Sequence, residues 1–160
     1  MYPYFGYAYP YRTPDVTSWK KYIKNNERFL SLLNESIRDE RMAQQFYGEL
    51  FQFAITPFER SMIQHAFVDE RKHEQMLLQV YRNLEGRDPE LPHVRAPEVR
   101  EFTEGVKKAF LDELEAQETY REMMLLVSGE AYALRDYLFE IWSDEVEHAQ
   151  RFTYIRAERT

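Results

Sequence analysis

Two copies of a short motif hold the residues whose types and spacing could do chemistry. The motif D-E-x-x-H occurs twice, with Glu70 and His73 in the first copy and Glu145 and His148 in the second. On an α-helix, residues three positions apart lie on the same face, so each pair can offer an oxygen and a nitrogen to one metal ion. A single such pair is most often a solvated ion pair. Two of the four histidines in one repeated motif point instead to a metal site.

A second motif recurs upstream of each of these copies. The pattern D-E-x-x-A-Q-x-x-Y begins at Asp39 and again at Asp112, so the two motifs follow each other in the same order in both halves of the chain. This internal similarity predicts a duplicated helical hairpin. It also adds Glu40 and Glu113 to the candidate metal ligands, with Tyr47 and Tyr120 about two helical turns further along.

Long helices must position these residues. A helical pattern extends through most of the chain after residue 17 and is interrupted three times. Thr56, Pro57 and Glu59 have the order of an N-cap, a first helical position and a capping box. Gly86 and three prolines interrupt the pattern over residues 85–97, and Ser128 is a plausible N-cap after the third helix. The expected helices are roughly 18–54, 57–85, 98–127 and 130–157.

This pattern predicts an all-α fold, an antiparallel four-helix bundle in which two duplicated hairpins are joined by a crossover linker. In every helix one glutamate interrupts an otherwise apolar stripe. The glutamates of each hairpin lie at similar distances from its turn, so they should be level with one another. We therefore expect four glutamates and two histidines to converge in the middle of the bundle.

Four buried carboxylates repel one another and need compensating cations. Two divalent ions would balance their charge, and the two histidines would complete the coordination. Oxygen-rich ligation with one imidazole per ion suits iron or manganese better than a structural zinc. The sequence leaves open whether Glu70 and Glu145, or Glu40 and Glu113, bridge the two ions.

Four further residues are candidates for supporting roles. Asp69 and Asp144 could accept the free ring N–H of the histidine on the opposing hairpin, or they could be exposed residues of a helix face. Tyr47 and Tyr120 could donate a hydrogen bond to a ligand carboxylate or act as local redox partners, or they could simply pack in the core.

The complete ligand set, a glutamate from each of two helices and E-x-x-H from each of the other two, resembles that of the ferritin-like di-iron carboxylate superfamily. Over residues 20–157 the chain is most similar to rubrerythrin-like and bacterioferritin-like bundles. The resemblance implies two iron ions, with two manganese ions as the alternative. It also implies an oxidoreductase that reacts with peroxide or dioxygen, of the ferroxidase or peroxide-reducing type, and a side-by-side homodimer.

The chain departs from rubrerythrins in two respects. It has no cysteine, so it lacks a rubredoxin-type iron centre, and electrons must come from ferrous iron or from an external donor. Rubrerythrins also tend to carry a carboxylate three residues after the ligand of the third helix, where this chain has Ala116. A manganese catalase-like enzyme with the same ligands is a second hypothesis.

A third hypothesis is a structural or spore-coat-associated protein that keeps a metal site. It is motivated by residues 1–14, which contain five of the 12 tyrosines and three of the seven prolines. We expect a flexible Tyr/Pro-rich tail over residues 1–16 and the bundle over residues 17–160. The net charge of −7 argues against nucleic-acid binding. No apolar run is long enough to span a membrane, and a cytoplasmic or spore-associated location is expected.

Overall fold

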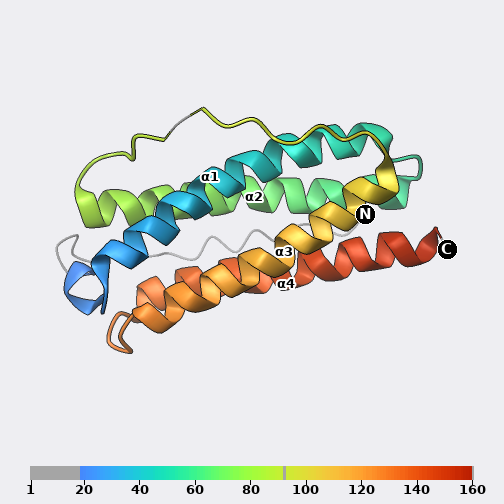
Figure 1. Cartoon of the computed structure of the whole chain (residues 1–160). Coiled ribbons are helices and arrows are strands. Elements are labelled where there is room, and N and C mark those ends of the chain that lie inside the picture. The colour runs from blue at the N-terminus through green and yellow to red at the C-terminus, as the bar shows by residue number, and fades with distance from the viewer. Residues whose placement is uncertain (1–18, 92, 160) are drawn as a thin grey trace.

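The computed structural model describes residues 19–91 and 93–159, and the predicted tail lies outside them. Within these residues the chain forms the predicted four-helix bundle, shown in Figure 1. A short 3-10 helix at Lys20–Tyr22 precedes the α-helices α1 (Asn26–Phe53), α2 (Pro57–Glu85), α3 (Phe102–Leu126) and α4 (Tyr132–Glu158). The pairs α1·α2 and α3·α4 pack as hairpins, and α1·α3 and α2·α4 join the hairpins together.

The described linker residues, 86–91 and 93–101, run along the outside of the bundle from the end of α2 to the start of α3 (Figure 1). Gly86 begins it with a φ of 70°, a left-handed conformation that favours glycine after a helix. The side-chain oxygen of Gln45 on α1 accepts a hydrogen bond from the backbone N–H of Ala96, which ties the linker to the first hairpin. The predicted crossover between the hairpins is therefore present.

Local capping sets most of the helix starts. The capping box at α2 is confirmed: the Thr56 hydroxyl accepts from the N–H of Glu59, and the Glu59 carboxylate accepts from the N–H of Thr56. Helix α3 begins at Phe102 rather than near residue 98, because the Glu101 carboxylate caps the N–H groups of Thr103 and Glu104. These side chains supply acceptors for N–H groups that have no partner within their helix.

Two other predicted boundaries were wrong. Helix α1 begins at Asn26, because the side chain of Asn25 caps it and the preceding residues pair with the α3–α4 connection through a bridge between Ile23 and Val127. Ser128 is not the N-cap of α4, which begins at Tyr132 after Ala131 without a side-chain cap. The backbone N–H of Ser128 donates to the carbonyl of Tyr22, so tertiary pairing took the place of the local cap.

The core consists of two hydrophobic clusters separated by a polar layer. One cluster includes Phe29, Leu33 and Leu138 and lies toward the α3–α4 turn. The other includes Leu50 and Phe152 and lies toward the α1–α2 turn. The glutamates that interrupt the apolar stripes lie between these clusters, so the packing on both sides holds them at a common level along the bundle.

Candidate metal centre

Six ligand-type side chains converge in the polar layer, and we call them the carboxylate–histidine cluster. Each helix contributes a glutamate, and α2 and α4 each add a histidine. All six are buried, with at most 4% of each residue exposed: Glu40, Glu70, His73, Glu113, Glu145 and His148. The structure thus brings together every ligand candidate that the repeat suggested.

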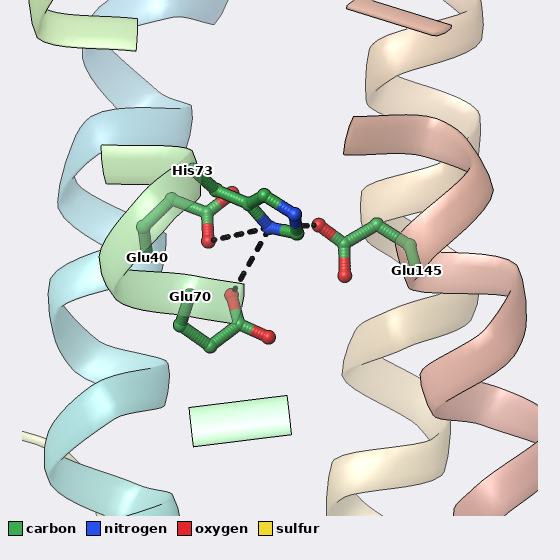
Figure 2. Close-up of side chains that lie close together, drawn as sticks. All are labelled: Glu40, Glu70, His73 and Glu145. Atoms are coloured by element: carbon green, nitrogen blue, oxygen red, sulfur yellow. Dashed lines mark ion pairs between the residues drawn. The ribbon is translucent and has the colours of Figure 1, made fainter. Parts of the chain in front are cut away.

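The cluster divides into two overlapping groups, each able to surround one ion. The first contains Glu40 and His73, and Figure 2 shows it with the two glutamates that it shares with the second group. The shared residues are Glu70 and Glu145. In each group the ligand atoms lie within 4.8 Å of one another. Two ions that share two carboxylates would form a dinuclear site.

The shared glutamates face both histidines. The two carboxylate oxygens of Glu145 lie 3.1 Å from Nδ1 of His73 and 3.1 Å from Nδ1 of His148, respectively. The corresponding distances from the two oxygens of Glu70 are 3.8 and 3.2 Å. Glu40 and Glu113 each approach one histidine only, at 3.7 and 3.6 Å. The geometry therefore separates a central pair of glutamates from an outer pair.

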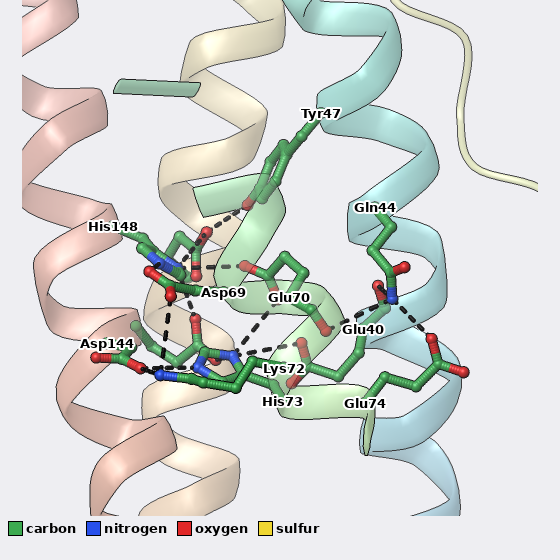
Figure 3. A network of polar contacts seen from close by, with 12 residues as sticks. Glu40, Gln44, Tyr47, Asp69, Glu70, Lys72, His73, Glu74, Asp144 and His148 are labelled. Carbon is green, nitrogen blue, oxygen red and sulfur yellow. Dashed lines mark hydrogen bonds and ion pairs between the residues drawn. The ribbon is translucent and has the colours of Figure 1, made fainter. Parts of the chain in front are cut away.

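The other ring nitrogen of each histidine faces an aspartate across the bundle. Nε2 of His73 lies 3.0 Å from Oδ2 of Asp144, and Nε2 of His148 lies 3.2 Å from Oδ2 of Asp69 (Figure 3). In the tautomer that carries its proton on Nε2, each histidine donates a hydrogen bond to the aspartate. Its Nδ1 atom is then unprotonated and directed at the glutamates. The aspartates are thus placed for the supporting contact expected of them.

The two tyrosines also connect the hairpins. The hydroxyl of Tyr47 on α1 donates to Glu113 on α3, and the hydroxyl of Tyr120 on α3 donates to Glu40 on α1. Both rings are at most 2% exposed. Each outer glutamate therefore accepts a phenol from the opposite hairpin, and the two contacts repeat the internal symmetry of the sequence.

Burial and mutual repulsion dominate the electrostatics of the cluster. Burial raises the pKa of Glu40 and of Glu113 well above its usual range, and the charges of the central glutamates raise both further. Burial alone would lower the pKa of His73 and His148, but the surrounding carboxylates outweigh it and raise both. The carboxylates of the cluster therefore favour a positive charge beside them in the core, on the histidines or on a bound cation.

This donor set fits divalent metal ions. Within the described residues, four buried cluster atoms have no hydrogen-bond partner: Glu40 Oε2, Glu70 Oε1, His73 Nδ1 and Glu145 Oε1. Buried polar atoms without partners are costly, so native structures rarely leave them unsatisfied unless another group occupies the space between them. Ligation would satisfy these atoms and balance the carboxylates together. The centre is a buried carboxylate–histidine metal site that can accommodate two ions.

The sequence analysis did not assign roles to four residues that contact this centre or its neighbours. Lys72 Nζ lies 2.6 Å from Asp144 and 3.7 Å from Asp69, and His65 Nδ1 lies 3.3 Å from Asp69. Gln44 and Gln117 donate to the backbone carbonyls of Glu70 and Glu145, respectively, and so join the helices within each hairpin. The repeat itself signals the glutamines, whereas Lys72 and His65 are recognisable only from the fold. His93 is exposed in the linker.

Comparison with known proteins agrees with this architecture. Residues 59–159 match the family described as the ferritin-like domain, which covers most of the chain. This chain belongs to the ferritin-like family. No curated protein matches it. No helix among the described residues of this ferritin-like protein is long and apolar enough to cross a membrane.

Solved structures with the same fold come from several organisms. A bacterioferritin-related protein from Bacteroides fragilis, described as a dodecameric thioferritin, is 18% identical with a TM-score of 0.68, covering 82% of this chain and 86% of its own. A hypothetical protein from Pyrococcus furiosus is 22% identical with a TM-score of 0.69, covering 81% and 88%. A protein from Xanthomonas campestris is 16% identical with a TM-score of 0.71, covering 82% and 90%. At these identities the likeness establishes the fold.

Proposed function

We propose that this ferritin-like protein is a di-iron carboxylate oxidoreductase that reacts with hydrogen peroxide or dioxygen. The observation that carries the proposal is the sharing of Glu70 and Glu145 between two buried ligand groups, because a pair of adjacent ions suits two-electron chemistry. When bound, two ferrous ions supply one electron each, enough with two protons to reduce hydrogen peroxide to two waters.

In this proposal Glu70 and Glu145 would hold both ions, since each faces both histidines. Glu40 and His73 would complete the ligands of one ion, and Glu113 and His148 would complete those of the other. Carboxylates can change between bridging and terminal binding as the charge of the metals changes, which suits a site that cycles between oxidation states. We propose ferrous iron or an external protein as the electron donor.

The supporting residues hold this arrangement in place. Asp69 and Asp144 accept the Nε2 protons, so that Nδ1 of each histidine stays available as a ligand. Tyr47 and Tyr120 donate to the outer glutamates, which restricts the orientation of each carboxylate and keeps one oxygen of each engaged. The two hydrophobic clusters cover the layer on its two sides along the bundle axis.

The test is elemental mass spectrometry on protein that carries no metal-binding tag, followed by addition of peroxide. Two irons per chain and a change of colour on peroxide addition are the expected result. Two manganese ions with release of oxygen would favour a manganese catalase-like enzyme instead. A variant His73→Ala that kept full metal content and activity would refute the ligand assignment, and exposed His93→Ala is the matched control.

A further inference from the structure

A cavity of about 430 Å³ lies between α1 and α3 and extends from the surface of the bundle to the carboxylate–histidine cluster. Exposed side chains such as Asp39 and Asp112 form its mouth, and Glu40, Glu113 and Glu145 form its floor. Its volume falls in the range of ordinary ligand pockets. The cluster is therefore accessible from one face of the bundle.

The internal repeat explains why the cavity exists. Ala43 and Ala116 occupy the same position of the duplicated motif and line the cavity from opposite helices. Each follows an outer glutamate by three residues, so it lies one turn beyond that glutamate on the same helix face. Two methyl groups at this level leave open space where larger side chains would fill the gap between α1 and α3.

The charge of the lining favours cations. Four acidic side chains lie at the mouth: Glu35, Asp39, Asp112 and Glu115. Two cations accompany them, and both are engaged by acids: Arg38 Nε lies 3.4 Å from Asp39, and Lys108 Nζ hydrogen-bonds both carboxylate oxygens of Asp112. With the cluster glutamates below, the lining is strongly negative. A cleft of one charge sign concentrates ions of the opposite sign.

The opposite face of the bundle, between α2 and α4, is occupied by ion pairs. Lys72 Nζ lies 2.6 Å from Asp144 and 3.7 Å from Asp69, so its ammonium group bridges the two helices beside the histidines (Figure 3). It also lies 3.3 Å from Glu140. Lys72 departs from the internal repeat, because the matching position of the second D-E-x-x-H motif is Glu147. Lys72 and its ion pairs cover this side of the cluster, so a cation that approached from it would have to displace them.

We propose that divalent cations reach the carboxylate–histidine cluster through the cavity between α1 and α3, and not through the face that Lys72 occupies. The proposal rests on the proposed function only in that the cluster binds metal, and it holds for any divalent ion that the cluster takes up. Narrowing the cavity at the alanines should slow uptake without changing the number of ions bound at equilibrium, since neither alanine is a ligand.

Uptake of Co²⁺ by the full-length metal-free protein tests the route, because its visible absorbance reports ligation without redox chemistry. We expect the variant Ala43→Leu/Ala116→Leu to bind Co²⁺ at least about tenfold more slowly than wild type and to reach the same stoichiometry. Exposed Ala157→Leu, at the end of α4, should bind at the wild-type rate. A double variant that loads as fast as wild type would overturn the route.

A second pair of variants tests the charge of the mouth without filling the cavity. Glu35→Gln/Glu115→Gln should slow uptake about two- to fivefold at low ionic strength, and the difference should vanish in about 1 M salt. Glu118→Gln/Glu130→Gln changes the net charge equally at exposed positions that do not line the cavity and should have a smaller effect. Equal slowing by both pairs would overturn a local role of the mouth.

Failure of the route and failure of the proposed function give different results. Wild-type protein that binds no Co²⁺ and no iron would refute the metal function, and the route with it. Wild-type protein that binds two ions per chain, together with unchanged kinetics in the narrowed variant, would refute the route alone.

Discussion

Replacing the outer glutamate Glu40 by glutamine should stabilise the metal-free protein and weaken its response to metal. Glu40 is 4% exposed, and its Oε2 atom has no hydrogen-bond partner among the described residues. Its Oε1 atom accepts from Tyr120, a contact that the amide oxygen of glutamine can keep. The substitution therefore removes a charge from the core while keeping the shape and one hydrogen bond of the side chain.

The magnitude follows from the cost of an unsatisfied buried acceptor, about 1–3 kcal/mol. Because the new amide group itself needs an acceptor, we expect a gain of about 1–2 kcal/mol, or about 2–8 °C in Tm for a domain of this size. Burial, and then the charge of Glu70, raise the pKa of Glu40, so its ionised form is the one that destabilises the fold. The gain from Glu40→Gln should thus grow as pH rises through that pKa.

Thermal unfolding at pH 8, with and without metal, measures both effects. Wild-type protein should gain Tm on metal addition, whereas Glu40→Gln should show at most half of that gain and should lose one ion by elemental mass spectrometry. Exposed Glu35→Gln on the same helix should change the stability of the metal-free protein by no more than about 0.5 kcal/mol. It should leave the Tm gain on metal addition and the number of bound ions unchanged. A Glu40→Gln protein that is less stable without metal and still binds two ions would refute the reasoning.

Three further predictions concern pH, a supporting aspartate and helix packing. The metal-free protein should lose Tm as pH rises from about 6 to 9, because the raised pKa of the cluster histidines and outer glutamates means that folding binds protons there, while saturating metal should remove this slope. Asp144→Asn should weaken metal binding about 10–100-fold by titration, and exposed Asp136→Asn should not. Gly105→Ala should cost about 0.5–2 kcal/mol in denaturant unfolding, because a Cβ there would lie 2.7 Å from Leu50 Cδ1 and this overpacking outweighs the gain in helix propensity. Gly48→Ala, with open space around it, should gain about 0.5–1 kcal/mol.

The fold could be predicted because several local signals agree. Apolar residues recur at helical spacing, the capping box at Thr56 sets one helix start, and Gly86 with the following prolines separates the hairpins. Two of the boundaries that failed, the starts of α1 and α4, are set by contacts from elsewhere in the chain. Asn25 starts α1 after a segment that pairs with the far turn, and that pairing uses the backbone of Ser128. Periodicity carries no information on such pairing.

The sequence by itself determined which six residues could bind metal, because the duplicated motifs place a glutamate, or a glutamate and a histidine, on the apolar face of every helix. Helical spacing alone fixes that arrangement within each helix. It does not fix which glutamates are central, because that depends on how the two hairpins face each other.

Only the tertiary structure decided the relations across the bundle. Packing of α1·α3 and α2·α4 puts Glu70 and Glu145 between both histidines, leads each tyrosine to the glutamate of the other hairpin, and places Lys72 beside both supporting aspartates. The same packing leaves a cavity on one face and ion pairs on the other. These contacts join residues far apart in the chain, so no local spacing rule can specify them.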